Sequence, residues 1–426
     1  MADPNAEPRL ARGRGAGSAA LVGVASLFSA VVTYLVMWMG ARFLSTADTT
    51  YLLTFLSVLF ATYGVLAGVS TETTRSVAAS LRDEHAPGPR TWAVALAVAV
   101  LSSLVVLGLA AAWQDEVLHF SAPALVWALT AGVFGYAFHS VLVGALSGNG
   151  SWDVCAAGLA GEAGVRLLVS LGVVWAGASV VPLAAASVAG SFAWVILWCV
   201  SPRGRDALRL RTDCLAPVLA RRMSVSAVAQ AANSMLVVGF PVLLAATTAT
   251  SDYRLGAPLL LAISLTRAPI LIPLNAYQGL AVSSLVHSGA GVGSTLKRLL
   301  VLVGGVALVG AFLAWAVGPW LMTTLFGADY EVAGWVLAGL TVGAAFTAGL
   351  TLTGATAQAL AAHQWFLAGW LTALVLAVGV LLLPGSMEVR AIAAMLVGPA
   401  GGLLVHVAGF RRRIRLGNAI EQDGRP

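Results

Sequence analysis

The sequence predicts an all-α integral membrane protein with about twelve transmembrane helices in two six-helix lobes and with both termini in the cytoplasm. Hydrophobic residues make up 59% of the 426-residue chain and charged residues only 10%, whereas soluble domains have roughly 25% charged residues. Apolar runs of about 20 residues, the length that crosses a bilayer core about 30 Å thick, follow one another along the chain. This composition excludes a soluble enzyme, a disordered chain and a nucleic-acid-binding domain.

The predicted spans are the apolar runs taken in chain order. The first run follows Arg9, Arg12 and Arg14, as in a signal peptide. It is too long for a signal sequence and lacks a clear small-residue cleavage site, so a retained helix is predicted. The spans cover residues 18–40, 49–69, 91–112, 122–146, 154–176, 180–200, 223–249, 256–280, 299–317, 331–355, 364–383 and 389–410.

The basic residues orient these spans. With the N-terminus inside, nineteen of the 24 Arg and Lys fall on cytoplasmic segments, and only Arg42, Arg254 and Arg390 fall outside. This asymmetry follows the positive-inside rule. An odd number of spans would place residues 411–415, which hold four Arg, on the wrong side. An even number with both ends inside is therefore predicted.

A basic segment at residues 201–222 divides the chain near its midpoint. We interpret it as an orienting linker on the anionic leaflet. The predicted organisation is an N-terminal tail, a first lobe, this linker, a second lobe and a basic C-terminal tail. These parts cover residues 1–17, 18–200, 201–222, 223–410 and 411–426. Transporters built from such halves place the substrate near the bilayer midplane.

Three charged residues lie well inside predicted spans, where a charge costs about 2.5–3.5 kcal/mol on insertion scales and therefore indicates function by default. Glu162 and Arg166 are four residues apart on the fifth span, hence on one helical face. They form either a structural ion pair or a functional site. Arg267 on the eighth span has no acidic residue within two turns. It must find a partner on another helix, a water-filled cavity or an anionic ligand, and lining a cavity is the favoured interpretation.

Polar residues accompany these charges on the seventh and eighth spans. Pro269 and Pro273 each remove a backbone donor, so a kink or break is predicted there. Gln278 lies about three turns after Arg267 on the same face, and Asn275 lies on that half of the helix. On the seventh span Gln230, Asn233 and Ser234 form a stripe, which either contributes to a cavity or makes interhelical hydrogen bonds.

Other chemistry is not indicated. The three Cys and six His have no metal-ligand spacing, and phosphate-loop and nucleophile-elbow motifs are missing. His139, within the fourth span, could carry a proton, but it is interpreted as a hydrogen-bonded core residue. We expect no enzyme activity, no metal and no cofactor. The coupling ion, H⁺ or Na⁺, is left open.

Two stretches resemble a known family. The sequence LFGADY at residues 325–330 opens a long run that ends with Gln358, Ala359 and Leu360, and small residues at the end of the second span are followed by Arg75. Both features are similar to prokaryotic polysaccharide exporters of the multidrug/oligosaccharidyl-lipid/polysaccharide (MOP) superfamily. Many members carry an acidic–basic pair early in the seventh helix, whereas residues 230–235 here are uncharged.

The resemblance implies a flippase with a fold like that of MATE transporters in a bacterial plasma membrane. Its cargo would be a lipid-linked oligosaccharide or polysaccharide precursor, moved to the outer leaflet by alternating access. Arg267 and Arg166 would bind its phosphates, because a planar guanidinium can bond two oxygens. The bilayer, the lipid-linked sugar and a polysaccharide polymerase or glycosyltransferases are the expected partners, and nucleic acid is not.

Three alternatives are kept. A multidrug or small-molecule exporter of the same superfamily would need a carboxylate for cationic drugs, and Glu162 is the only one well inside the spans. A membrane glycosyltransferase generally needs a sizeable outer loop or domain with acidic residues, whereas every outer loop here is short. The third alternative is a transporter fold that serves as a non-transporting assembly partner in polymer synthesis.

Overall fold

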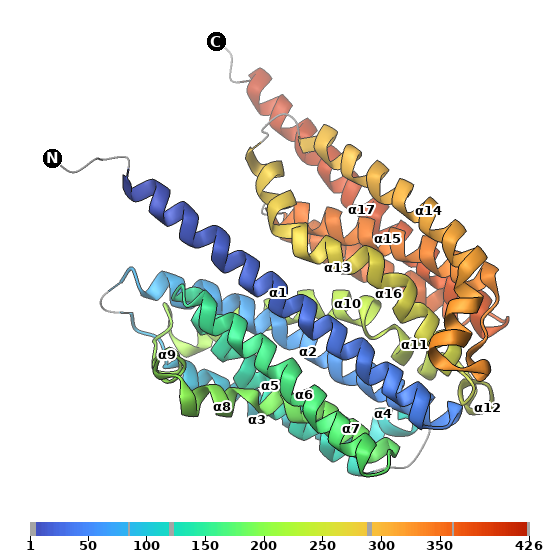
Figure 1. The fold of residues 1–426 in the computed structure, drawn as a ribbon. Helices are drawn as coiled ribbons and strands as arrows, with labels where there is room; N and C mark the ends of the chain where they lie inside the picture. Colours follow the sequence, from blue (N-terminus) through green and yellow to red (C-terminus); the bar gives the residue numbers. More distant parts are fainter. Residues whose placement is uncertain (1–5, 84–85, 119–122, 288–291, 360–361, 424–426) are drawn as a thin grey trace. The chain divides into compact units, whose positions relative to one another are not determined.

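The computed structural model describes residues 6–83, 86–118, 123–287, 292–359 and 362–423, and nearly all of them are helical (Figure 1). Within these ranges the β-structure is one isolated antiparallel bridge between Arg90 and Arg211. Ten helices are long and apolar enough to cross a membrane, and a bent pair adds an eleventh. The remaining predicted span corresponds to helix α13, whose first part, Ala257–Leu271, is also apolar. The predicted all-α multi-pass membrane fold is therefore confirmed.

The helices divide into two compact units, residues 1–231 and 232–426. The division falls inside helix α10 (Ala216–Val237). The basic linker predicted at residues 201–222 thus lies wholly in the first unit. The predicted tail beyond residue 410 is helical to Asp423, since helix α17 continues through it.

The first unit contains six spans and three short segments. Helix α2 packs against α5, α1 against α6, and α3 against α5. The sixth span is interrupted by one 3-10 turn, η2. The spans are α1 (Ala6–Phe43), α2 (Thr46–Ser80), α3 (Thr91–Gly108), α5 (Pro123–Gly148), α6 (Trp152–Trp175) and the series α7 (Val180–Ala189), η2 (Gly190–Phe192), α8 (Ala193–Val200). The short segments are α4 (Ala110–Trp113), the π-helical turn η1 (Gln114–Leu118) and α9 (Pro202–Ala207).

The core of the first unit lies along α2 and α5, where large apolar side chains such as Leu52, Phe55 and Leu129 are almost fully buried. Two residues near the start of α10, Leu219 and Met223, belong to the same cluster. The beginning of α10 is therefore fixed to the first unit by van der Waals packing of apolar side chains.

The second unit contains the rest of α10 and the helices that follow. Helix α15 packs against α14, α17 and α13, and α16 packs against α17. Trp370 on α16 is fully buried. The helices are α11 (Phe240–Thr247), α12 (Thr250–Tyr253), α13 (Ala257–His287), α14 (Val292–Phe326), η4 (Ala328–Tyr330), α15 (Gly334–Ala359), α16 (His363–Leu381) and α17 (Met387–Asp423).

The helix break of the second unit lies on a different span from the one that carries Pro269 and Pro273. A kink or break was predicted at these prolines on the eighth span; α13 continues as one helix through both positions, so there is no break there, and the kink stays a prediction. The seventh span is the broken one. Its two parts, α10 and α11, meet at an angle of 71°. Membrane helices tolerate proline where neighbouring groups satisfy the freed backbone atoms, so proline alone does not locate a break.

Candidate functional site

The first candidate site is the ion pair inside the first unit. Glu162 and Arg166 lie in the middle of α6 and are only 5% and 3% exposed. Their spacing of four residues places both side chains on one face of the helix, and Arg166 Nη2 donates directly to Glu162 Oε1. Two opposite charges thus neutralise each other away from water, which is the condition under which buried charges are tolerated.

Arg166 also contacts two other spans. Its Nη1 donates to Thr33 Oγ1 on α1 at 3.1 Å, and its guanidinium carbon lies 4.8 Å from the centroid of the Phe60 ring on α2. Its Nε has no hydrogen-bond partner among the described residues. One side chain therefore links α6 to α1 and α2 through a hydrogen bond and a cation–π contact.

A glycine and aromatic rings shape the surroundings of this pair. A Cβ on Gly190 of η2 would lie 2.5 Å from the Glu162 backbone oxygen, closer than van der Waals contact allows. On α5, His139 is buried and its ring centroid lies 5.5 Å from that of Tyr136. Tyr136 in turn stacks on Tyr63 at 3.8 Å. His139 is buried as predicted, but its Nδ1 has no hydrogen-bond partner among the described residues, so the predicted hydrogen bonding is not seen at this atom.

The second candidate site surrounds Arg267 on α13, which is 6% exposed. Its Nη1 donates to the backbone oxygen of Val237 at 2.7 Å, and its guanidinium carbon lies 5.2 Å from the Phe240 ring centroid. Val237 ends α10 and Phe240 begins α11. The intramembrane arginine therefore contacts both sides of the break in the seventh span.

Pro241 explains why a carbonyl is available there. In an unbroken helix the N–H of residue 241 would bond to the oxygen of residue 237, four residues earlier. Pro241 has no N–H, and it occupies the first turn of α11, where proline is well tolerated. The Val237 oxygen consequently takes its hydrogen bond from Arg267.

The remaining predicted site residues belong to α10 and α13. Gln230 and Asn233 are half-buried on α10, with Gln230 in the first unit and Asn233 in the second. Pro269 is exposed on α13. The side chains of Asn275, Gln278 and Pro273 are not among those that the structure describes. Neither unit by itself contains the full set of predicted residues, and their role in substrate binding stays a prediction.

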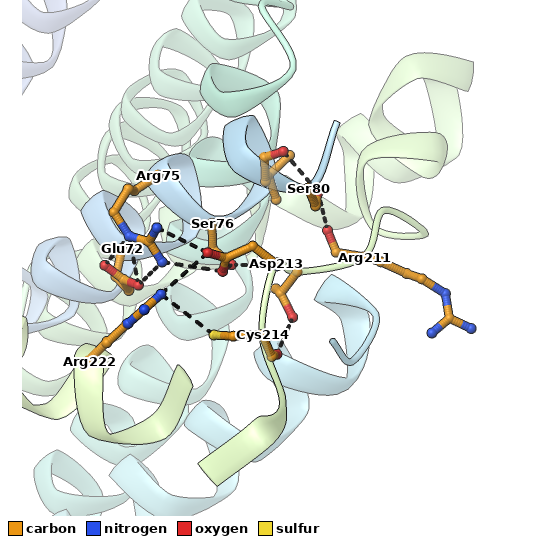
Figure 2. A network of polar contacts seen from close by, with 10 residues as sticks. Glu72, Arg75, Ser76, Ser80, Arg211, Asp213, Cys214 and Arg222 are labelled. Atoms are coloured by element: carbon orange, nitrogen blue, oxygen red, sulfur yellow. Dashed lines mark hydrogen bonds and ion pairs between the residues drawn. The ribbon is translucent and has the colours of Figure 1, made fainter. Parts of the chain in front are cut away.

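A third polar site lies at the end of the first unit that the arginine distribution places in the cytoplasm (Figure 2). We call it the Asp213 clamp; it consists of Glu72, Arg75, Ser76, Asp213 and Arg222. Arg75 donates to both carboxylates, through Nε to Glu72 Oε2 at 2.9 Å and through Nη1 to Asp213 Oδ2 at 3.1 Å. Ser76 donates to Asp213 Oδ1 at 2.6 Å, and Arg222 to Oδ2 at 3.3 Å. The clamp thereby joins α2, the linker and α10.

Backbone pairing holds the same segment of linker. The amide of Thr212 donates to the oxygen of Pro89, the amide of Gly88 donates back to Thr212, and the Thr91 amide donates to Leu210. Ser80 on α2 donates to the Arg211 oxygen at 2.7 Å. Residues 208–214 of the linker are therefore fixed against the loop between α2 and α3, rather than being a free connection.

The environment of Asp213 stabilises its charged form. Partial burial raises the pKa of the Asp213 carboxyl, but the hydrogen bonds donated by Ser76 and Arg75 outweigh burial and lower the pKa to about 2. For the adjacent Cys214 thiol, burial and the Asp213 carboxylate both raise the pKa. Asp213 is therefore ionised at any physiological pH and Cys214 is a neutral thiol.

Sequence reasoning did not find the clamp. It used Arg75 as an orienting charge and as part of the family resemblance, and Arg222 as an orienting charge. It did not connect them with Asp213, which lies 138 residues after Arg75 in the chain. The available signal was an acidic residue within a basic linker, placed next to Thr212 and Cys214. The clamp residues form one group only because the fold packs the linker against α2.

Comparisons with known proteins give relatives in sequence and neighbours in structure. No protein-family model matches the chain. Two uncharacterized proteins of Mycobacterium tuberculosis are similar: Rv1510 is 35% identical and Rv3630 is 36% identical, each over 399 residues that make up 93% of this chain and 92% of the relative. Mb3654 of Mycobacterium bovis is 36% identical over the same coverage. These relatives establish a family but leave its activity open.

Solved structures with the same fold are transporters. A MOP superfamily transporter from Pyrococcus furiosus, whose binding pocket of reverse polarity suggests a different function, matches with a TM-score of 0.65 and 15% identity over 94% of this chain and 95% of its own. An outward-facing multidrug resistance MATE transporter matches with a TM-score of 0.65 and 15% identity over 94% and 96%. At this identity the likeness establishes the MATE-like fold alone.

Proposed function

We propose that this chain, which belongs to the same family as Rv1510 and Rv3630, is a membrane transporter that flips an anionic lipid-linked oligosaccharide or polysaccharide precursor to the outer leaflet by alternating access. Its MATE-like fold extends over 94% of the chain, and this fold is that of transporters of the MOP superfamily. A charged sugar headgroup cannot cross hydrocarbon unaided, because burial of unpaired charges costs many kcal/mol.

The neutralisation of Glu162 is the observation that carries the choice of cargo. An exporter of cationic drugs needs a carboxylate that can meet the drug, and Glu162 is the only carboxylate well inside the predicted spans. It is 5% exposed and bonded to Arg166. Freeing it for a cation would leave Arg166 as an uncompensated buried charge, which is strongly unfavourable. The intramembrane charges therefore favour an anionic cargo.

The cargo itself would need two kinds of contact. Phosphates favour arginine, whose guanidinium offers five donors in a planar arrangement. Arg267 remains our first candidate, followed by Arg166, which would have to bind phosphate while still paired with Glu162. Sugars favour amides and hydroxyls, for which we propose Gln230, Asn233, Asn275 and Gln278. In this conformation one Arg267 donor already serves Val237, so binding through Arg267 would use its other donors or accompany a rearrangement at the break.

The energy source is a separate part of the proposal. The sequence has no ATP-binding motif, so transport would depend on an ion gradient, the membrane potential or removal of the flipped product. H⁺ and Na⁺ are both candidates. A polysaccharide polymerase or glycosyltransferases acting on the flipped lipid would supply that removal, in the plasma membrane of a bacterium.

A small-molecule exporter is the second candidate. The observation that favours it is the likeness to the multidrug resistance MATE transporter over 94% of this chain. It would predict that Glu162 separates from Arg166 during transport and meets a cation directly. Substitution of Glu162 would then abolish drug efflux without destabilising the protein.

The deciding experiment uses the full-length protein in liposomes that contain a fluorescent lipid-linked oligosaccharide. Flipping makes the internal half of the fluorophore accessible to an external quencher, and protein-free liposomes give the background. We expect flipping above background with the sugar lipid and no uptake of ethidium by the same vesicles. Ethidium transport without sugar-lipid flipping would establish the exporter and overturn the proposed cargo.

A further inference from the structure

The first half of α10 has two opposite faces. Leu219 and Met223 are buried in the core of the first unit. On the other side Val218, Val225 and Val228 are 46%, 64% and 56% exposed. At 100° per residue these three positions fall within about 80° of one another. The exposed side of this helix is therefore apolar along several turns.

Two arginines lie on this same exposed side. At 100° per residue Arg221 falls between Val225 and Val228 around the helix, and Arg222 lies about 40° beyond Val218, at the edge of this face nearer the buried side. Arg221 is exposed, and no carboxylate lies within ion-pair distance of it in the part of the chain that the structure describes. The Arg222 side chain is 44% exposed and uses Nη1 toward Asp213. The face thus combines arginine donors at one level with apolar side chains one and two turns further on.

The local charge is small and positive. Within the Asp213 clamp the two carboxylates, Glu72 and Asp213, balance the two guanidiniums of Arg75 and Arg222. Arg221 then adds one positive charge. The side chain of Arg211, which is not part of the clamp, points away from it (Figure 2). A ligand with a single negative charge matches this balance, whereas a pyrophosphate would carry an excess.

We propose that this face of α10, formed by Val218, Arg221, Arg222, Val225 and Val228, binds an anionic phospholipid of the adjacent leaflet. The phosphodiester accepts hydrogen bonds from the two guanidiniums, and an acyl chain covers Val225 and Val228. Val228 lies about 10 Å along the helix axis from Arg221 at 1.5 Å per residue, a length suited to the glycerol group and the start of an acyl chain. Guanidiniums bind phosphate oxygens well because the two groups carry opposite charges and the planar guanidinium can donate two parallel hydrogen bonds.

The site has a defined geometry because the clamp fixes it. Asp213 holds Arg222 from the side that faces the linker, and the buried pair Leu219 and Met223 fixes the rotation of α10. Close packing at Gly68 adds to this, since a Cβ there would lie 2.6 Å from the Ser226 backbone oxygen. The arginines are therefore presented on a rigid helix rather than on a mobile loop, and this site is independent of the proposed cargo.

The test measures lipid binding to delipidated full-length protein by native mass spectrometry, with phosphatidylglycerol and phosphatidylcholine as probes. We expect phosphatidylglycerol to bind more tightly. An arginine near an anionic lipid contributes about fivefold in affinity, so Arg221→Gln lowers phosphatidylglycerol affinity by about fivefold and Arg221→Gln/Arg222→Gln by about thirtyfold. Val225→Asn weakens binding of the same lipid through its chain.

Matched variants separate this site from general effects. Arg203→Gln removes another exposed arginine of the linker, one paired with Asp153, and should leave phosphatidylglycerol affinity unchanged. If Arg221→Gln/Arg222→Gln does not fold, Arg222→Lys replaces Arg222→Gln in the double variant, because lysine keeps the positive charge. Equal binding of both phospholipids by the wild type, or unchanged phosphatidylglycerol affinity in Arg221→Gln, overturns the proposal. Preferential binding of a polyprenyl pyrophosphate at these residues also overturns it and assigns the face to the cargo.

Discussion

Arg267 donates a 2.7 Å hydrogen bond to the backbone oxygen of Val237, the acceptor that Pro241 leaves without its usual helical donor. Two residues that lie 30 positions apart in the chain therefore meet at this break, one as the acceptor and the other as the donor. The helix breaks where proline removes a donor, and an arginine from the next long helix replaces that donor. The same guanidinium lies over the first aromatic ring beyond the break.

The first prediction tests whether Arg267 serves the break. Arg267→Ala leaves the Val237 oxygen without this charged donor and should lower the free energy of unfolding by about 2–3 kcal/mol. In a Pro241→Ala background residue 241 regains its N–H, so the cost of Arg267→Ala should fall by about 1–2 kcal/mol. Thermal unfolding in detergent of the two single variants and the double variant measures this coupling.

The same variants test the cargo contact. If Arg267 binds phosphate through both oxygens, Arg267→Lys should fold normally and lose much of the flipping activity, because lysine lacks the planar guanidinium. Additive stability costs in the Pro241 cycle would contradict the structural role. Full flipping by a folded Arg267→Ala protein would show that Arg267 does not hold the cargo.

The second prediction concerns Glu162 and Arg166. Breaking a buried pair leaves one uncompensated charge and typically costs about 3–5 kcal/mol. Glu162→Gln and Arg166→Gln should therefore each destabilise the protein more than the double variant does. The measurement is the midpoint of thermal unfolding, with Asp206→Asn, a weakly paired and exposed carboxylate, as the control. A stable Glu162→Gln protein that does not transport would instead assign Glu162 to ion coupling.

A third prediction follows from the contact between η2 and α6. Gly190→Ala places a methyl group 2.5 Å from the Glu162 oxygen and 3.2 Å from the Arg166 Cβ. Such overpacking typically costs about 1–3 kcal/mol. Gly161→Ala is the matched control, because open space surrounds that position on the same helix as the ion pair. Equal stability of the two variants would mean that η2 moves away from α6 without cost.

The pH dependence of the Asp213 clamp supplies the fourth prediction. The folded-state pKa of Asp213 is lowered to about 2, below the value of about 3.9 for an unfolded aspartate. Its contribution to stability is therefore fully present above about pH 5 and disappears as the pH falls toward 2. The difference in unfolding temperature between the wild type and Asp213→Asn should be constant from about pH 8 to 5 and shrink below about pH 4.

A variant outside the clamp controls for general acid effects. Asp252→Asn changes an exposed aspartate in the second unit, and its difference from the wild type should not follow the same pH curve. A wild-type minus Asp213→Asn difference that stays constant down to about pH 3 would show that Asp213 does not stabilise the fold through its charge.

The fifth prediction tests the orientation derived from the arginine distribution. In a cysteine-free protein, a single cysteine at Arg209, whose side chain is 73% exposed, should react with a membrane-impermeant maleimide only after the cells are opened. A cysteine at Leu255, an exposed position between α12 and α13, should react in intact cells. Labelling of position 209 from outside would reverse or refute the twelve-span orientation.

The sequence by itself determined the membrane class, the order of the spans and the placement of Glu162 and Arg166 on one helical face, because these depend on local properties. An apolar run of about 20 residues crosses a bilayer whatever surrounds it, and two residues four apart share a helical face wherever the helix packs. The resemblance at residues 325–330 led to the MOP superfamily, and the MATE-like fold agrees with it.

Only the tertiary structure decided where the long-range polar contacts fall. Pro241, Pro269 and Pro273 look alike in the sequence, but the helix breaks before Pro241, where Arg267 from α13 takes up the freed carbonyl, and continues through the others. The same holds for the clamp: Asp213 meets Arg75 across 138 positions because α2 and the linker pack together. A polar group inside a membrane protein takes its partner from whichever helix lies beside it, and that neighbour is set by packing between spans rather than by distance along the chain.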